Sequence, residues 1–228
     1  TRSGECMIIN VFANDSNSYW TDAAKADARA MLNEGLEFLK DAADGYEVSE
    51  LSFTTVEVDF RVGEDAADYT VGGNYGKSAF IGTEYDGIKQ FTDSVCEGKS
   101  YDNVCVLFHF NKHGRSYFVP CERDFTNESE WSYEFGVMFY STPEQGDYFS
   151  CPAVYAHELL HAFGAKDLYE GTVSELGDKL AGTYFASDLM RYEPTNIREC
   201  YIGPLTAKLI GWDKWLNPQL KAVLDECL

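Results

Sequence analysis

The sequence predicts an α/β fold, in which a twisted, largely parallel mixed sheet carries helices. Two observations lead to this fold class. In the first half of the chain, apolar runs with strand character alternate with segments of helical hydrophobic periodicity, and such a β-α-β-α-β order is built most simply from parallel strands joined by crossover helices. With 228 residues, 45% of them hydrophobic, the chain is also long enough to bury a core of ordinary size in one compact domain.

The first half supplies three strands and two helices. The apolar run from Cys6 to Ala13 is expected to be a strand, and Asp22 to Ala43 carries apolar residues at helical spacing. Leu51 to Val62 alternates apolar and polar residues, as a strand does. A second helix is expected from Tyr85 to Cys96. The strand expected from Asn103 to Phe110 is apolar on both faces, which is typical of a buried parallel strand.

Three shorter segments complete this part of the chain. Val71 to Gly82 is rich in glycine and is expected to be a loop. The apolar runs from Ser116 to Pro120 and from Phe135 to Ser141 would each add a strand to the sheet. We expect the second of these two strands to lie at an edge.

The second half contains a helix that ends at a glycine. A proline suits the first turn of a helix that continues from Ala153 to Phe163, and Gly164 is well placed to end it. Beyond this glycine the chain is irregular until Leu205 to Gly211 forms the last helix. We therefore expect residues 1–164 to form an upper subdomain and residues 165–228 to form a smaller, mostly irregular and helical lower subdomain.

The stretch HELLHAFGAKD carries the residue types of a catalytic metal site. His157 and His161 are four residues apart, so on a helix both imidazoles project from nearly the same face and can bind one cation. Catalytic zinc usually has three protein ligands and a water, and Gly164 can turn the chain back so that Asp167 becomes the third ligand. Glu158 is placed to accept a proton from the zinc-bound water. One catalytic Zn²⁺ ion is therefore expected.

This pattern, HExxHxxGxxD, resembles the metzincin clan of zinc peptidases. Specifically, it resembles the branches in which aspartate replaces the usual third histidine, as in snapalysin-like and immune-inhibitor-A-like enzymes. SDLM, Ser187 to Met190, looks like the clan's methionine-containing turn, and Gly203 to Trp212 looks like the helix that follows this turn. The resemblance implies that Met190 supports the zinc site from below and that Tyr192 helps to stabilise the oxyanion.

Two classes of function follow from this interpretation. The first is a zinc endopeptidase that hydrolyses a protein or peptide substrate, held extended along an edge strand such as Phe135 to Ser141 and bordered by the loop between Asp167 and Ser187. The alternative is a binding or adhesion module on the same scaffold, with a structural zinc or none. An intact Glu158 favours the enzyme, because a structural site needs no base.

Other residues compete for the third ligand position. His109, in a buried strand, and His113, in a turn, are the remaining histidines, and each is an alternative to Asp167. The gluzincin interpretation instead takes Glu175 from a second helix, but it leaves the methionine turn unexplained. The sequence contains no GxSxG motif, and its histidines are better used by a metal, so a serine or cysteine nucleophile is not indicated.

Charge and cysteine content bear on partners and location. The chain has 38 acidic and 18 basic residues and a formal net charge of −20, so neither nucleic acid nor an anionic membrane surface is expected as a partner. The acidic loop at residues 63–68 is a candidate calcium site. No apolar run is long enough to predict membrane insertion, and a monomer is expected. Seven cysteines without a CxxC pair suit an exported protein, so secretion is expected.

Overall fold

The computed structural model describes residues 4–48, 50–66, 75–120, 134–141, 149–169, 171–192, 195–213 and 217–227. The chain divides into two compact units, and each is described by itself. The sheet unit comprises Gly4–Met31 and Ser52–Ser150, and the C-terminal unit comprises Leu32–Leu51 and Cys151–Leu228, together with the first three residues. The helix that carries HELLHAFGAKD therefore groups with the C-terminal residues. The predicted subdomains, 1–164 and 165–228, stay a prediction.

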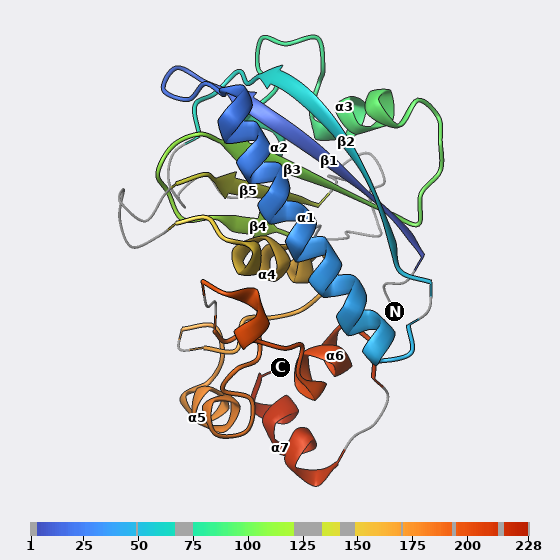
Figure 1. The fold of residues 1–228 in the computed structure, drawn as a ribbon, viewed down its shortest axis with the longest axis vertical. Coiled ribbons are helices and arrows are strands. Elements are labelled where there is room, and N and C mark those ends of the chain that lie inside the picture. The colour runs from blue at the N-terminus through green and yellow to red at the C-terminus, as the bar shows by residue number, and fades with distance from the viewer. Residues whose placement is uncertain are drawn as a thin grey trace. The chain divides into compact units, whose positions relative to one another are not determined.

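The sheet unit contains a five-stranded sheet of order β2-β1-β3-β5-β4 (Figure 1). Strands β1 (Glu5–Asn14), β2 (Ser52–Arg61), β3 (Asn103–Phe110) and β5 (Phe135–Phe139) are parallel to one another, and β4 (Tyr117–Val119) is antiparallel to β5. These strands lie where the hydrophobic patterns predict them. The α/β fold with a largely parallel sheet is confirmed.

The predicted place of Phe135 to Ser141 at a sheet edge is wrong. Strand β5 pairs with β3 on one side and with β4 on the other, and all five of its residues are buried. An edge strand exposes one row of backbone groups and is usually short or polar, whereas a wholly apolar strand is typical of the interior of a sheet. The edge on this side is β4, only three residues long and half-buried throughout.

Two helices of the sheet unit differ in detail from the prediction. The segment expected to be a loop contains a short helix, α2 (Tyr75–Ser78), and residues 71–74 lie outside the described residues. Helix α3 (Ile88–Cys96) begins three residues later than expected, directly after Gly87. Residues of both helices, among them Tyr75 and Phe91, join an aromatic-rich core on the sheet.

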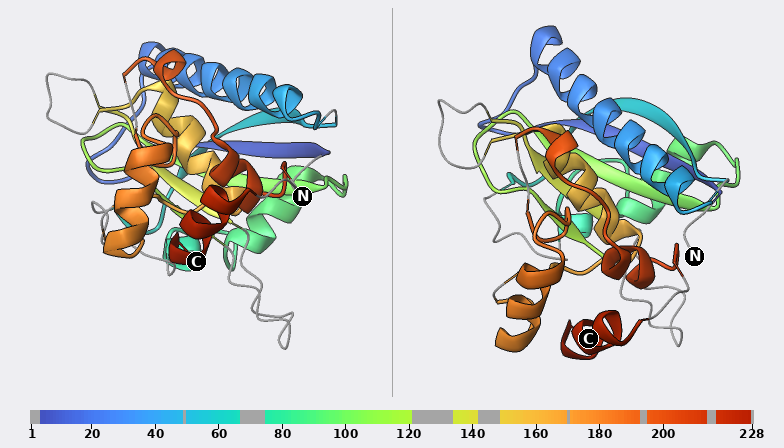
Figure 2. Two further views of the ribbon diagram at one scale, coloured as in Figure 1. Left: turned by 90° about the horizontal axis from the view of Figure 1, so that it is seen from below. Right: turned by 60° about the horizontal axis from the view of Figure 1, so that its bottom comes forward.

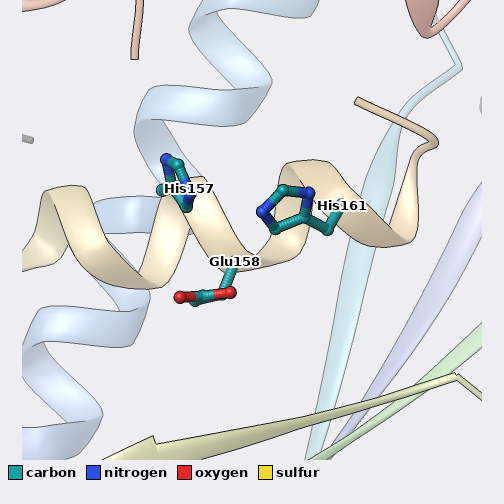
Figure 3. Close-up of side chains that lie close together, drawn as sticks. All are labelled: His157, Glu158 and His161. Carbon is teal, nitrogen blue, oxygen red and sulfur yellow. The ribbon is translucent and has the colours of Figure 1, made fainter. Parts of the chain in front are cut away.

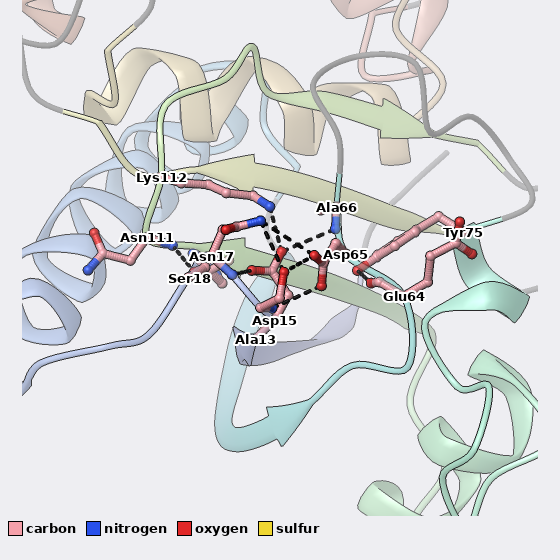
Figure 4. A network of polar contacts seen from close by, with 12 residues as sticks. Ala13, Asp15, Asn17, Ser18, Glu64, Asp65, Ala66, Tyr75, Asn111 and Lys112 are labelled. Carbon is pink, nitrogen blue, oxygen red and sulfur yellow. Dashed lines mark hydrogen bonds and ion pairs between the residues drawn. The ribbon is translucent and has the colours of Figure 1, made fainter.

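A polar network ties together the loops that follow β1, β2 and β3 (Figure 4). The buried carboxylate of Asp15 accepts hydrogen bonds from the backbone N–H groups of Asn17 and Ala66, at 2.8 and 3.2 Å, and forms an ion pair with Lys112. Asp65, in the acidic loop, accepts a hydrogen bond from the Ser16 backbone at 2.9 Å. Residues 67 and 68 of that loop lie outside the described residues, so calcium binding there stays a prediction.

Helix α1 (Asp22–Gly45) belongs to the sheet unit in its first half and to the C-terminal unit in its second half. The described residues of the C-terminal unit also form the helices α4 (Pro152–Ala162), α5 (Glu175–Tyr184), α6 (Pro204–Leu209) and α7 (Pro218–Cys227), and a 3₁₀ helix (Ile197–Glu199). None of the described helices combines the length and the apolar character needed to cross a lipid bilayer.

Two of these helices correct the prediction. The segment between Asp167 and Ser187 is not only a loop, because it contains α5, and α6 is not the last helix, because α7 follows it. Helices α5 and α7 lie side by side (Figure 2), and the Ser174 hydroxyl donates a hydrogen bond to the Glu226 carboxylate at 3.0 Å. Each helix thus depends on the other for part of its packing.

Candidate metal centre

Helix α4 holds the two histidines of the motif on a buried segment. Pro152 occupies the first turn, where its missing N–H costs no hydrogen bond, and the following residues are mostly alanine, leucine and tyrosine. His157 is 2% exposed and Glu158 is 6% exposed. Burial of polar side chains is costly unless they have partners, so the surroundings of these groups decide what they can do. Figure 3 shows both histidines and Glu158 close together on the helix.

Both imidazoles are oriented by backbone carbonyl groups. His157 Nδ1 lies 3.0 Å from the carbonyl oxygen of Leu189, and His161 Nδ1 lies 3.0 Å from that of Ala165. A carbonyl oxygen only accepts, so each Nδ1 carries the hydrogen and donates it. In the neutral tautomer Nε2 then presents a lone pair, the arrangement seen in metal-binding histidines whose second nitrogen donates to a carbonyl group.

The Asp167 carboxylate converges on these two ring nitrogens. Its Oδ1 atom lies 3.0 Å from His157 Nε2 and 3.3 Å from His161 Nε2. This oxygen is buried and makes no hydrogen bond of ordinary geometry among the residues that the structure describes. Three atoms that carry lone pairs therefore meet at one point. Their mutual repulsion is relieved by protons on the imidazoles or by one cation shared among the three atoms.

The pKa shifts reflect the same crowding. Burial lowers the pKa of the His161 imidazole, but the hydrogen bond and charge of Asp167 outweigh burial, so this pKa is raised above its ordinary value. Burial would raise the pKa of the Asp167 carboxyl, yet His157 and His161 beside it hold this pKa well below its usual range. Without a metal, the cluster therefore favours a carboxylate next to a protonated imidazole.

The spacing fits a tetrahedral divalent cation. With metal–ligand bonds of about 2.0–2.1 Å, the ligand atoms of a tetrahedral site lie roughly 3.3 Å apart. The distances of 3.0 and 3.3 Å from Asp167 Oδ1 to the two Nε2 atoms are close to this value. The Glu158 carboxylate also lies near, within 4.8 Å of the imidazole nitrogens, but Asp167 is closer. Of these two carboxylates, Asp167 lies closer to the two Nε2 atoms.

A glycine ends α4 and returns the chain toward the histidines. Gly164 has a φ of +94°, its N–H donates to the His161 carbonyl at 2.9 Å, and the Ala165 N–H donates to the Leu160 carbonyl at 3.0 Å. These two bonds form a Schellman motif. A Cβ at position 164 would meet no atom within 4 Å, so the glycine is needed for its backbone angle and not for space.

The turn from Ser187 to Met190 accepts two hydrogen bonds through its backbone carbonyl groups, one from a histidine of α4 and one from the segment after α4. The Leu189 carbonyl accepts from His157 Nδ1, and the Met190 carbonyl accepts from the N–H of Leu168, directly after Asp167, at 2.8 Å. Met190 itself is fully buried. The Tyr192 side chain is 48% exposed, and its help to an oxyanion stays a prediction.

The competing residues lie in other settings. Glu175 is exposed in the first turn of α5. His109 is buried in β3, where its Nε2 lies 3.3 Å from Asn10 Oδ1 and burial lowers its pKa to about 3. His113 is exposed. Within the described part of the chain, the histidines of α4 are thus joined by Asp167 and Glu158, and none of the three alternatives is seen beside them.

Two residues of this site escaped the sequence analysis. The Asp188 carboxylate holds the turn, and Arg191 donates hydrogen bonds to the Leu168 carbonyl at 2.5 Å and to Asp178 of α5 at 2.6 Å. The contact of Asp188 with the Met190 N–H is local, but the other partners of these two residues lie between 13 and 23 positions away, beyond the reach of a short-range spacing rule.

Comparison with known proteins finds distant structural similarity. No family model matches the sequence, and no curated protein matches it. Among solved structures, the chain is similar to the crystal structure of metalloproteinase-II from Bacteroides fragilis, with a TM-score of 0.44 and 12% sequence identity. The match covers 91% of this chain and 51% of that protein, so the chain spans about half of its length. Such a similarity does not show family membership, and any functional assignment depends on the geometry of the site.

Proposed function

We propose that this protein is a zinc-dependent peptidase, with His157, His161 and Asp167 as zinc ligands and Glu158 as the general base. The observation that carries the proposal is the convergence of Asp167 Oδ1 on both Nε2 atoms, at 3.0 and 3.3 Å, without a hydrogen bond of ordinary geometry to that oxygen among the described residues. A buried carboxylate oxygen and two imidazole lone pairs facing one another form a ligand set for a cation.

The donor set favours zinc over the other common metals. Two imidazole nitrogens and one carboxylate oxygen suit a borderline metal in tetrahedral geometry, whereas calcium and magnesium take six or more oxygen ligands. Three protein ligands also leave a fourth position open, as in catalytic zinc sites. Zinc bound here would polarise a substrate carbonyl and lower the pKa of a water molecule toward about 7.

Glu158 supplies the proton transfers of the proposed reaction. Its carboxylate lies in the same cluster as the imidazole nitrogens but farther from them than Asp167, where it would face a water molecule bound at the fourth metal position. As general base it takes a proton from the attacking water, and as general acid it then passes this proton to the amine that leaves. A purely structural metal site would have no use for a second buried carboxylate beside the ligands.

Two further residues complete the proposal. Met190, fully buried in the turn, would support the ligands by packing and not by binding the metal. Tyr192, two residues later with a half-exposed ring, would donate its hydroxyl to the oxyanion that forms as water attacks the carbonyl. Neither role is needed for metal binding.

The proposal is tested by measuring bound metal and peptide cleavage on the same preparation. We expect one zinc ion per chain, cleavage of some members of a varied peptide library, and loss of this cleavage on dialysis against a chelator. Stoichiometric zinc without cleavage of any peptide would support a binding or adhesion module instead. Absence of tight zinc binding would remove the proposal.

A further inference from the structure

We propose that Asp188 is the positioning residue of the metal centre: its buried carboxylate fixes the turn that orients His157 and anchors the segment carrying Asp167. This inference rests on the proposed function, because it concerns how the same site is held. Asp188 touches none of the three ligands through its carboxylate hydrogen bonds. It acts through the backbone of its own turn.

The Asp188 carboxylate is fully buried and has a hydrogen bond donor on each side. Its Oδ1 atom accepts from the Met190 N–H at 2.9 Å, and its Oδ2 atom accepts from the Gly203 N–H at 2.9 Å. The Thr206 hydroxyl lies 2.8 Å from Oδ1 and 2.9 Å from Oδ2. A buried carboxylate satisfied in this way is fixed in place, since losing any partner leaves a desolvated polar group.

The turn held by Asp188 presents two carbonyl groups to the site. The Leu189 carbonyl accepts from His157 Nδ1 at 3.0 Å, and the Met190 carbonyl accepts from the Leu168 N–H at 2.8 Å. The first bond sets the ring orientation and tautomer of one proposed ligand, and the second holds the residue next to another. One carboxylate therefore controls two of the three proposed ligands through adjacent peptide groups.

The Asp188 carboxylate lies so close to Gly203 that no side chain fits at position 203. A Cβ added at Gly203 would lie 2.5 Å from Asp188 Oδ2, closer than real Cβ atoms come to any atom. Gly203 has a φ of −73°, which any residue can adopt, so its side chain is excluded by the carboxylate and not by backbone strain. Position 203 thus offers a second way to displace Asp188, without removing its charge.

The turn also has bonds that do not involve the carboxylate. The Leu189 N–H donates to the Tyr201 carbonyl at 2.9 Å, and the Tyr201 N–H donates to the Ser187 carbonyl at 3.1 Å. These bonds should keep the two segments paired when the carboxylate is altered. Loss of Asp188 is then expected to misplace the ligands in a folded protein, so metal affinity is the sensitive measurement.

The first test is Asp188→Asn, which keeps the size of the side chain. An amide can accept from only one of the two backbone N–H groups, and its NH₂ group faces the other donor. We expect zinc affinity, measured by chelator competition, to fall about 10- to 100-fold, the usual effect of altering a group that orients a metal ligand. We also expect the visible absorption bands of the cobalt-substituted protein to change, because these bands report ligand geometry.

The matched control is Leu220→Ala, which removes a buried side chain from α7 and leaves the hydrogen bonds of the turn intact. It should lower the melting temperature of the metal-free protein, yet leave the zinc affinity within about 3-fold and the cobalt spectrum unchanged. A purely structural role of Asp188 predicts the same pattern for Asp188→Asn as for this control.

The outcomes separate the inference from the proposed function. If Asp188→Asn folds and binds zinc and cobalt as the wild type does, the inference is overturned while the proposed function stands. If it fails to fold, Gly203→Ala takes its place, and a wild-type affinity and spectrum in that variant overturn the inference equally. If the wild-type protein binds no zinc, both the proposed function and the inference are wrong.

Discussion

His161 Nδ1 lies 3.0 Å from the carbonyl oxygen of Ala165, so the residue that follows the helix-ending glycine orients a proposed metal ligand on the helix itself. Gly164, between them, has a φ of +94°, which L side chains adopt only with strain. The helix end and the metal site are therefore one structure: the turn that stops α4 also fixes the His161 ring and leads the chain to Asp167.

Substitution of this glycine should harm the metal site more than the fold. Gly164→Ala is expected to lower the free energy of unfolding of the metal-free protein by about 1–2 kcal/mol, from backbone strain, and to weaken zinc binding about 10-fold. Gly171→Ala is the control, because Gly171 has a φ of +95° and equally open surroundings. Chemical denaturation should show similar losses of stability in the two variants. Zinc titration should show weaker binding only in Gly164→Ala. Equal zinc affinities would contradict the role of Gly164.

Asp167→Asn should separate metal binding from stability. The amide keeps the shape of the side chain, and its NH₂ group can donate to an imidazole lone pair, so the metal-free protein should keep its melting temperature at a pH where the imidazoles are neutral. Zinc affinity should fall at least about 100-fold, since an amide oxygen carries no charge. Glu175→Gln is the comparison variant, because Glu175 would be the third ligand in the gluzincin interpretation. A loss of affinity in Glu175→Gln with none in Asp167→Asn would favour the gluzincin ligand set.

Arg191 should contribute measurably to stability. Its guanidinium donates to the Leu168 carbonyl at 2.5 Å and to Asp178 at 2.6 Å, and the Arg191 and Asp178 side chains are 21% and 29% exposed. Arg191→Met should lower the free energy of unfolding by about 1 kcal/mol. Lys89→Met removes an ion pair with Asp93 on α3 whose side chains are more than half exposed, and should cost less than about 0.5 kcal/mol. Urea denaturation of both variants measures the two losses in the free energy of unfolding. Equal losses would contradict the larger contribution of Arg191.

The stabilisation caused by zinc should grow with pH while the stability of the metal-free protein falls. In the metal-free protein the pKa of His161 is raised, so its contribution to stability is complete below the unfolded value and is lost as pH rises through the folded pKa. The melting temperature should therefore fall as pH rises above about 6.5. Burial raises the pKa of the Asp188 carboxyl to about 6, so its own contribution to stability is lost at lower pH, as pH rises toward this value. Zinc binding needs unprotonated imidazoles, so the rise in melting temperature caused by zinc should grow as pH rises above about 6.5. A zinc effect that shrinks with rising pH would contradict the ligand set.

The sequence predicts most of the fold because its hydrophobic patterns are strong. Strand β3 is apolar on both faces and lies in the sheet interior, as expected. Helix α5 was missed because Gly177 and Gly182 lower its helix propensity. The structure gives the reason for both glycines. Added Cβ atoms would lie 2.9 Å from the Glu226 carbonyl oxygen and 2.7 Å from the Arg191 guanidinium, so close packing overrides propensity.

Helix α7 has a helix-start signal in the sequence. Asn217 precedes Pro218, and the Leu220 N–H donates to the Asn217 side chain at 2.6 Å, as in an N-cap followed by a proline in the first turn. The place of β5 was wrong for another reason, because its pairing with β4 depends on tertiary structure that a local pattern does not contain.

The candidate site divides in the same way. The spacing of His157, Glu158 and His161 on one helix, with Gly164 after it, is local and readable in the sequence. The partners that orient these groups are not local. The Leu189 carbonyl lies 32 positions from His157, and Asp188 meets Thr206 across 18 positions, so only the folded chain reveals them.

The central claim is that Glu158 performs metal-dependent hydrolysis, and Glu158→Gln tests it most directly. The measurement is zinc content together with cleavage of a peptide that the wild-type protein cuts. We expect one zinc ion per chain in both proteins and a rate of cleavage at least about 100-fold lower in the variant, because glutamine cannot accept the proton of water. Cleavage by the variant at the wild-type rate would contradict this account.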